Sequence, residues 1–85
     1  MTDDTTLDVF LGGRLRIRQP RTGYRAATDP ILLAAAVGAR AGDSILELGC
    51  GVGVALLALA TRVPDLRLCA VERQAAYADL ARLNA

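Results

Sequence analysis

The sequence has no His, no Trp and no Lys, and all ten of its basic residues are Arg. Because it also lacks paired cysteines at metal-ligand spacing, a zinc site is not expected. Its formal net charge of +1 gives no overall attraction to nucleic acid. No apolar run approaches the roughly 20 residues of a membrane span, and no signal peptide is present. We therefore expect a cytoplasmic protein with reduced thiols and no membrane partner.

With 85 residues, the chain can form at most one small domain. A chain of this length buries roughly 60–65% of the surface that it exposes when unfolded, so its stability is expected to be marginal. The composition is 53% apolar but only 4% aromatic, and Ala, Leu and Val dominate the apolar part. This composition suits tightly packed α/β layers better than a disordered chain or a coiled coil.

The most informative segment is 44–53, in which an apolar strand containing Glu47 runs into a glycine-rich loop. The loop glycines occupy alternate positions: Gly49, Gly51 and Gly53. A second apolar run, 66–71, ends in another acid, Glu72. A glycine turn after one strand and an acid after the next is how an α/β fold holds an adenosine-like ligand. Both carboxylates are expected to face one crevice at the carboxyl ends of the strands.

Two common glycine loops do not fit this segment. The dinucleotide fingerprint needs Gly or Ala at its sixth position, where this chain has Val54 or Leu56, depending on the register. A phosphate loop of the nucleotide-hydrolase type needs Gly-Lys-Ser/Thr, and the chain has no Lys. The pattern Glu-x-Gly-x-Gly-x-Gly resembles motif I of class I S-adenosylmethionine-dependent methyltransferases.

This resemblance implies roles for the loop and its acids. Glu47 would contact the ammonium group of S-adenosylmethionine, directly or through water, and Glu72 would accept hydrogen bonds from the ribose hydroxyls. The loop amides would face the ligand, and Gly49, Gly51 and Gly53 would form the cofactor-binding loop. Within it, Gly53 would serve mainly to let the following helix pack against the strand. The alternative is a tight strand-to-helix turn without a ligand. Cys50 is interpreted as a small loop residue, because no His is present to activate it.

The order of elements predicts an α/β fold with a right-handed parallel crossover. Hairpin arms at 7–11 and 14–19 flank a two-residue Gly12-Gly13 turn. Asp29 caps a buried helix over 30–39 that begins with Pro30. The remaining expected elements are a strand at 44–48, a helix at 54–62, a buried strand at 66–71 that places Cys69 in the core, and a helix at 74–84. Residues 1–27 are expected to form a tail, hairpin and connector, and residues 28–85 an incomplete S-adenosylmethionine-binding domain.

The resemblance extends upstream through 21–33, where a basic residue, Thr-Asp and Ile-Leu-Leu follow one another. This segment is similar to the small-domain methyltransferases, in particular to bacterial tRNA adenine methyltransferases that act on valine tRNA. The similarity covers about Val9 to Asn84 and implies that Arg25 and Thr28 lie near the methionine end of the cofactor. The alternatives are a solvated Arg25 and a purely structural helix start. The fold implied is the N-terminal part of a Rossmann-like methyltransferase sheet.

The Asn-Pro-Pro-Tyr motif that orients the acceptor nitrogen in this family is missing. We therefore assign no catalytic residue, and the sequence resembles the N-terminal third of such an enzyme. The function implied is S-adenosylmethionine binding in a methyltransferase that acts on an amino group of RNA, foremost adenine in tRNA. Ribosomal RNA guanine and protein glutamine remain alternative acceptors. The alternative from another class is a non-catalytic interaction or scaffold module.

Two further expectations concern surfaces. Alternating arginines on the second hairpin arm could follow an RNA phosphate backbone, or form a solvated face: Arg14, Arg16 and Arg18. The strand at 44–48 should keep one unpaired edge, and the helix at 30–39 should be partly uncovered. Residues 1–85 alone are therefore expected to be marginally stable, to self-associate and to show no methyl transfer.

Overall fold

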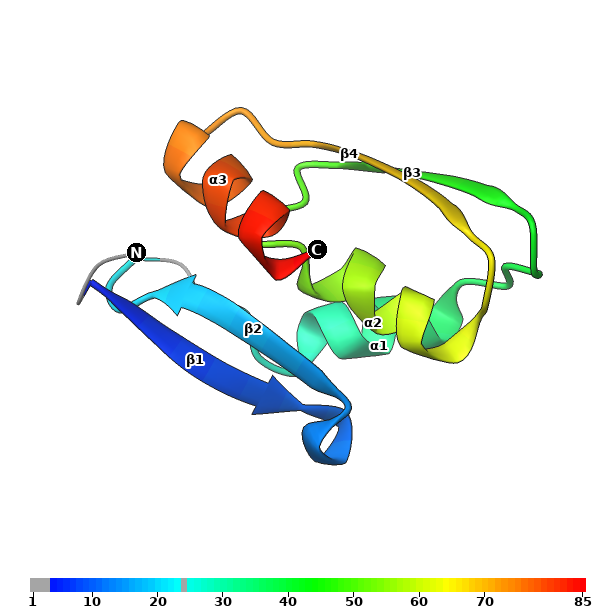
Figure 1. The fold of residues 1–85 in the computed structure, drawn as a ribbon, viewed down its shortest axis with the longest axis horizontal. Coiled ribbons are helices and arrows are strands. Elements are labelled where there is room, and N and C mark those ends of the chain that lie inside the picture. The colour runs from blue at the N-terminus through cyan, green and yellow to red at the C-terminus, as the bar shows by residue number, and fades with distance from the viewer. Residues whose placement is uncertain (1–3, 24) are drawn as a thin grey trace.

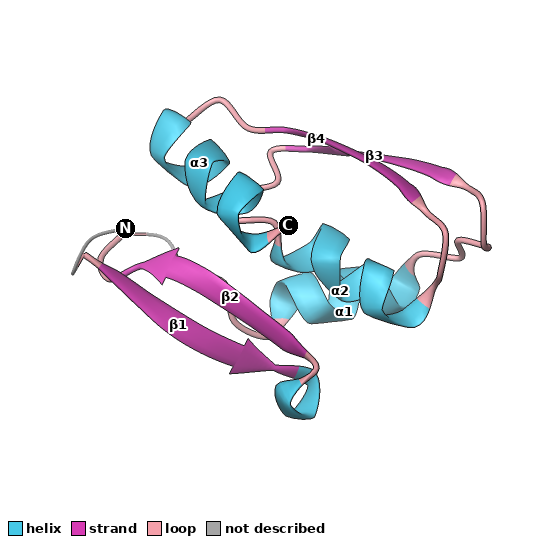
Figure 2. Cartoon of the chain, in the orientation of Figure 1, coloured by secondary structure: helices cyan, strands magenta, loops and turns pink. Residues whose placement is uncertain are grey.

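The computed structural model describes residues 4–23 and 25–85. Its elements follow the predicted order of a hairpin, a helix and a β-α-β-α unit (Figures 1 and 2). In chain order they are β1 (Thr5–Phe10), a 3-10 turn η1 (Leu11–Gly13), β2 (Leu15–Pro20), α1 (Asp29–Ala36), β3 (Ser44–Leu48), α2 (Val54–Arg62), β4 (Arg67–Val71) and α3 (Ala75–Asn84). The structure is a small α/β unit, as expected.

The hairpin is confirmed, but its turn differs from the predicted two-residue turn. Strands β1 and β2 pair antiparallel, from Thr5 opposite Pro20 to Phe10 opposite Leu15. The turn is a 3-10 turn that starts at Leu11, whose φ of 54° is unusual for a residue with a side chain. Gly12 and Gly13 continue with φ of 63° and 92°, which glycine adopts without strain. The longer turn places Arg14 before the strand rather than in it.

Helix α1 is shorter and less buried than predicted. It ends at Ala36, because Val37 is extended at φ −80° and ψ 121°. The guanidinium of Arg62 donates to the carbonyls of Ala34 and Val37 and so satisfies the end of the helix. Asp29 lies inside the first turn, and the cap position belongs to Thr28, whose side chain makes no capping bond. The prediction that Asp29 caps the helix is therefore wrong.

The β3-α2-β4-α3 unit closely follows the predicted ranges, and β3 and β4 pair parallel from Ser44 opposite Arg67 to Leu48 opposite Val71. Among the described residues, β3 pairs with β4 alone. Its other edge is therefore unpaired, as predicted. A right-handed crossover is the rule for such a connection.

One hydrophobic core joins the hairpin to the helices. Helices α1 and α2 lie between the hairpin and the parallel pair in Figure 1. The largest fully buried apolar side chains are Ile17 of β2, at 0% exposure, and Leu59 of α2, at 2%. Ala34 of α1 and Leu80 of α3 belong to the same cluster. The core therefore contains residues of both the predicted hairpin region and the predicted cofactor domain.

The parallel pair stands apart from this core, and two predictions fail there. Every residue of β4 is exposed, including Cys69, which was predicted to be buried. A cavity of about 500 Å³ separates the inner side of β4, at Leu68 and Ala70, from Leu56 and Leu57 of α2. Because no described element covers its outer face, β4 is not the buried strand that its composition predicts. Leu32 of α1 is likewise 61% exposed, which corrects the expectation of a buried helix and agrees with a partly uncovered one.

The side chain of Asn84, the last residue of α3, forms hydrogen bonds to two other segments of the chain. The side-chain oxygen of Asn84 accepts the amide of Arg18 at 2.7 Å. Its side-chain nitrogen donates to the carbonyls of Arg18 and Val52, at 3.0 and 2.9 Å. One side chain at the end of α3 therefore links β2 to the glycine loop. No helix of the described residues is long and apolar enough to cross a membrane.

Candidate functional site

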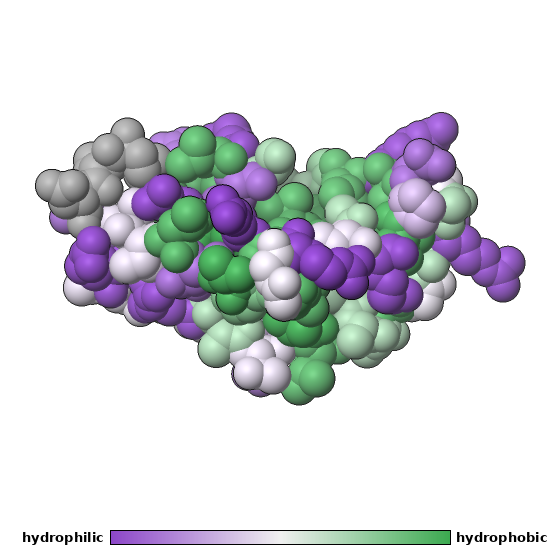
Figure 3. Space-filling model, turned by 60° about the horizontal axis from the view of Figure 1, so that its bottom comes forward, coloured by the Kyte–Doolittle hydropathy of each residue, from purple (hydrophilic) through white to green (hydrophobic). Residues whose placement is uncertain are grey.

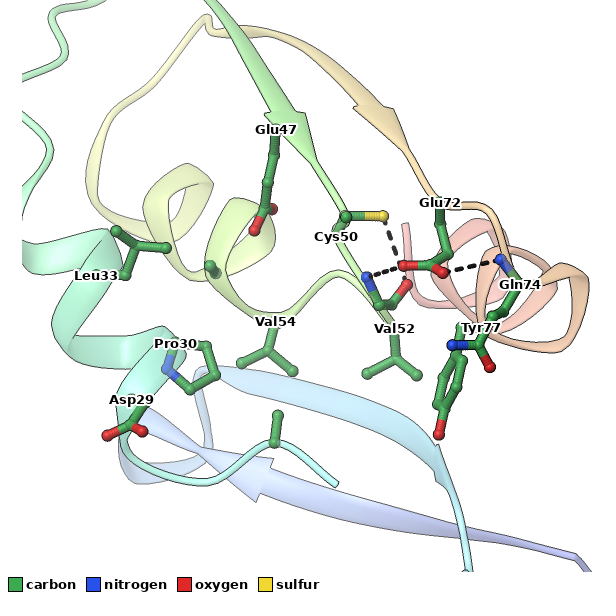
Figure 4. A pocket seen from close by; sticks show the side chains of 14 residues that line it. Asp29, Pro30, Leu33, Glu47, Cys50, Val52, Val54, Glu72, Gln74 and Tyr77 are labelled. Atoms are coloured by element: carbon green, nitrogen blue, oxygen red, sulfur yellow. Dashed lines mark hydrogen bonds between the residues drawn. The ribbon is translucent and has the colours of Figure 1, made fainter. Parts of the chain in front are cut away.

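A cavity of about 480 Å³ opens at the carboxyl ends of β3 and β4 (Figure 4). Ligands in open α/β sheets bind at this edge. The lining comes from α1, β3, the glycine loop, the first turn of α2, the segment after β4, α3 and the connector before α1. Both predicted acids line it, Glu47 and Glu72. The expectation that these carboxylates share one crevice is therefore confirmed.

The glycine loop is shaped by left-handed backbone that only glycine adopts easily. Gly49 has φ of 72° and Gly51 φ of 58°, and the space next to both is open. The amides of Gly49 and Cys50 donate to the carbonyl of Val71, which ties the loop to the end of β4. At these two glycines, therefore, no side chain separates the backbone from the cavity.

Gly53 has a different role from the other two. It precedes α2 at φ of 95°, and a Cβ there would lie 3.4 Å from Cδ1 of Leu57 and 3.7 Å from Cβ of Ala81. These are ordinary contact distances, so the left-handed φ rather than a lack of space favours glycine here, and the residue does not line the cavity. The prediction that Gly53 lets the helix pack against the strand is therefore not supported, because its nearest neighbours belong to α2 and α3.

Glu72 is half-buried directly after β4, and both of its oxygens accept backbone hydrogen bonds. Oε1 accepts from the amide of Gly51 at 2.8 Å, and Oε2 from the amide of Gln74 at 2.9 Å. These two amides, that of Gln74 first, lower the pKa of the Glu72 carboxyl. Glu72 is therefore ionised at neutral pH. Each oxygen keeps a lone pair that could accept a further donor.

Glu47 has the opposite environment. Its side chain points from β3 toward α1 and α2 (Figure 4), and its Oε1 is buried with no hydrogen-bond partner among the described residues. Burial raises the pKa of the Glu47 carboxyl. The surrounding pocket wall is mainly apolar, with Pro30 and Leu33 of α1 and Val54 of α2. A buried unpaired carboxylate oxygen is costly, so this atom favours a cationic or donor group in the pocket.

Cys50 lies between the two acids but is not suited to act as a nucleophile. Burial, followed by the negative charges of Glu47 and then Glu72, raises the pKa of its thiol. The thiolate is the reactive form, so a raised pKa suppresses reactivity. No group of three or more His, Cys, Asp or Glu side chains in 4–23 and 25–85 could hold a metal ion.

The structure places Arg25 and Thr28 outside the pocket lining. The guanidinium of Arg25 forms an ion pair with Asp8 at 2.6 Å and also donates to the carbonyl of Pro20. Thr28 directly precedes Asp29, which does line the pocket. Arg25 is therefore bound to the hairpin. It is not a solvated loop residue, and it does not line the pocket.

The three hairpin arginines predicted to contact RNA do not share one face. Alternation along β2 places Arg16 and Arg18 opposite the buried Leu15 and Ile17. Arg14 lies in the turn instead, and its guanidinium donates to the carbonyl of Thr61 at 3.0 Å. Figure 3, which brings the lower side of Figure 1 forward, shows hydrophilic and hydrophobic residues interleaved rather than one continuous hydrophilic face. The predicted stripe is therefore shortened to two residues.

Several residues around the pocket were missed by sequence reasoning. Gln19 is 1% exposed, and its side chain accepts a hydrogen bond from the amide of Ala26, a pocket residue. A Gln in an alternating strand would ordinarily be expected on the polar surface. Tyr77 and Leu33 also line the cavity. Their helical spacing marked them only as apolar positions. The sequence indicates Asn84 only as the end of its helix and does not predict its hydrogen bonds to Arg18 and Val52.

The fold and the pocket define an α/β unit with a glycine-rich pocket at the carboxyl ends of two parallel strands. A comparison with protein-family models gives no match. Among curated proteins, the chain is 37% identical over 82 residues to the tRNA1(Val) (adenine(37)-N6)-methyltransferase of Porphyromonas gingivalis strain W83. It is 40% identical over 62 residues to the protein of that name from Aliivibrio fischeri.

These matches cover 92% and 73% of this chain, but 32% and 26% of the two relatives. A second Porphyromonas gingivalis strain, ATCC 33277, gives the same 37% identity over 82 residues. The chain thus spans about a third of the length of the curated relatives that it matches. The resemblance seen in the sequence is confirmed: over this stretch the chain is related to the tRNA1(Val) (adenine(37)-N6)-methyltransferases.

Proposed function

We propose that the pocket at the ends of β3 and β4 binds S-adenosylmethionine. The observation that carries this proposal is the buried Oε1 of Glu47, which has no hydrogen-bond partner in 4–23 and 25–85, in a cavity whose other end holds the ionised Glu72. The ligand carries an ammonium group at one end and ribose hydroxyls in its middle. A pocket with two separated carboxylates and an apolar wall matches that distribution of groups.

Glu47 takes the methionine ammonium in this arrangement. A cation beside the buried carboxylate favours its charged form, so binding would offset the desolvation that raises its pKa. The hydrogen bond would satisfy the oxygen that lacks a partner. A negative charge in a partly apolar site also discriminates against ligands that place an anion there.

Glu72 and the start of α2 take the other polar groups. The lone pairs left on Glu72 accept the two ribose hydroxyls while its bonds to Gly51 and Gln74 keep the carboxylate in place. Val54 and Ala55, in the first turn of α2, line the pocket, and the N-cap residue of that helix, Gly53, has no side chain that could cap it. Its free amides suit the methionine carboxylate.

We further propose that the activity served by this pocket is methyl transfer to an adenine amino group of tRNA. The support is the activity for which the three relatives are named. The amino nitrogen would attack the methyl carbon while the carbon–sulfur bond breaks, leaving S-adenosylhomocysteine and releasing one proton. Such a displacement needs positioning rather than a covalent enzyme intermediate. Within this chain, the proposed roles are in cofactor binding.

Calorimetry of S-adenosylhomocysteine and S-adenosylmethionine binding tests the pocket. Glu72→Ala and Glu47→Gln should each weaken binding by at least tenfold, because each removes a charged hydrogen-bond acceptor. Asp79→Asn is the matched control, since Asp79 is an exposed acid on α3 that pairs with Arg82. Binding by Glu72→Ala equal to that of the unmodified chain would remove the basis of the proposal.

We propose that the outer face of β2 contributes to RNA binding through Arg16 and Arg18, with Arg14 beside it at the turn. The support is the position of Arg16 and Arg18 away from the core. The double variant Arg16→Ala/Arg18→Ala should have a lower affinity for a tRNA anticodon stem-loop and a weaker salt dependence of binding. Unchanged affinity and salt slope in the double variant would refute this contact.

The exposed side of the parallel pair favours a second candidate function, a module that associates with itself. Leu46 is 60% and Leu48 74% exposed, next to the unpaired edge of β3. Free strand edges and apolar faces promote pairing between chains. Sedimentation velocity over a hundredfold concentration range should show reversible association. If the chain is monomeric throughout that range and binds the cofactor, the self-association module is refuted and the cofactor proposal stands.

A further inference from the structure

The connector between β2 and α1, described at residues 21–23 and 25–28, contributes to the wall of the pocket through one residue. Ala26 of this connector lines the cavity next to Asp29 and Pro30 of α1. At its other end, Gly23 has φ of 89°, and a Cβ added there would lie 3.1 Å from the hydroxyl oxygen of Tyr77, another pocket residue. The residues described on either side of position 24, 21–23 and 25–28, form no helix or strand. Its position therefore depends on side chains that hold it from outside.

Asp8 of β1 is the centre of the group that does this. Its Oδ2 accepts from Nη2 of Arg25 at 2.6 Å, from Nε2 of Gln19 at 2.9 Å and from the hydroxyl of Thr6 at 3.2 Å. Nη1 of Arg25 also donates to Thr6 Oγ1 at 2.9 Å and to the Pro20 carbonyl at 2.6 Å. One carboxylate of the hairpin therefore holds the guanidinium of a connector residue.

Gln19 carries the restraint from Asp8 to the pocket wall. The residue is 1% exposed, and its Oε1 accepts the amide of Ala26 at 2.7 Å. Its Nε2 donates to the Ala26 carbonyl at 3.3 Å as well as to Asp8. Because a carboxylate only accepts, Asp8 determines which end of the Gln19 amide is nitrogen. The opposite end is thereby presented to the Ala26 N–H.

We propose that Asp8 and Gln19 are positioning residues for the pocket: they hold the connector at Ala26 and so set the affinity of the site, without touching the ligand. Arg25 acts with them, through Asp8 rather than by contact with the cofactor. The inference about affinity rests on the proposed function. The inference about the connector is independent of it, because the hydrogen bond of the Ala26 amide can be observed without a ligand.

Amide hydrogen exchange and ligand binding, measured on the same variants, test both parts. Asp8→Ala should speed exchange of the Ala26 amide and weaken S-adenosylhomocysteine binding, each by about five- to tenfold, as expected for one lost hydrogen bond. Asp8→Asn keeps an acceptor oxygen and should show a smaller change in both. It also serves if Asp8→Ala does not fold. Asp79→Ala, which deletes an exposed acid paired with Arg82, is the matched control and should change neither.

The outcomes separate the two claims. Unchanged Ala26 exchange in Asp8→Ala and Asp8→Asn would overturn the positioning role. Faster exchange with unchanged affinity would overturn the link between the connector and the site. If the unmodified chain binds no cofactor, the proposed function fails, and the exchange of Ala26 alone decides whether Asp8 and Gln19 hold the connector. A loss of exchange protection throughout the chain would show a general structural defect and contradict a local role.

Discussion

The chain contains two two-stranded sheets that differ sharply in how they are supported. The antiparallel pair, β1 and β2, buries Leu15, Ile17 and Gln19 on one face and is linked to α3 through Asn84. The parallel pair, β3 and β4, leaves most of its apolar side chains exposed. Both pairs have a complete ladder of strand pairing. Backbone pairing alone therefore does not determine burial, which requires a covering layer.

The two sheets also place their acids differently. Asp8 of the hairpin is satisfied by three donors. Glu47 of the parallel pair has an oxygen without a partner among the described residues. The carboxylate of the supported sheet thus joins segments of the chain, while that of the unsupported sheet is available for the ligand proposed above. The following substitutions test this contrast, starting with the largest expected effect.

Ile17→Ala should cause the largest loss, about 2–5 kcal/mol of unfolding free energy, because it leaves a cavity in the core that joins the hairpin to the helices. A domain of this size has roughly 4–13 kcal/mol in total, so the variant should be close to unfolding. Urea unfolding followed by circular dichroism measures the change. Ile17→Val, which removes one methylene, should cost only about 0.5–1.5 kcal/mol. Equal effects for both variants would mean that Ile17 is not packed as described.

Asn84→Ala should cost about 1–3 kcal/mol, because it leaves the amide and carbonyl of Arg18 and the carbonyl of Val52 without their partner. The same unfolding experiment applies. Arg82→Ala on the exposed side of α3 is the control and should cost less than about 0.5 kcal/mol. A similar result for the two variants would show that the link between β2 and the glycine loop contributes nothing.

Glu47→Gln should stabilise the chain at pH 7 by a smaller amount. The folded-state pKa of Glu47 is raised, so the folded protein binds its proton more tightly and loses stability as pH rises through that pKa. Gln removes the charge, and its advantage should disappear below the ordinary carboxyl range, where Glu47 is protonated in both states. Glu72 has a lowered pKa, so Glu72→Gln should have the opposite sign at pH 7. The effect of Glu72→Gln should diminish as pH falls through the lowered folded-state pKa of Glu72. Unfolding measured at pH 3 and pH 7 tests both signs, and a pH-independent effect of either substitution would contradict its assignment.

Leu48→Ala should have the smallest effect, within about 0.5 kcal/mol, since its side chain is 74% exposed in the unsupported sheet. A loss comparable to that of Ile17→Ala would mean that something covers this face in solution. Repeating the measurement at a tenfold lower protein concentration would show whether a second copy of the chain provides that cover.

Local rules predicted most of the elements. The strand at 44–48 and the helix at 54–62 have the predicted bounds, because apolar runs, glycines and Pro64 mark their ends within a few residues. The shared crevice of Glu47 and Glu72 could also be predicted, since parallel strands place their carboxyl ends at one edge. The relationship to tRNA1(Val) methyltransferases was visible in the same short motifs.

Tertiary structure decided what these elements contact. Cys69 and Leu32 are apolar by sequence, yet they are exposed, since exposure depends on which layers pack over them. The sequence likewise could not assign Arg25 to Asp8 or Gln19 to Ala26, because these pairs join different segments. Sequence periodicity determines which face of an element is apolar, whereas the partner of a polar side chain is determined only when distant segments meet.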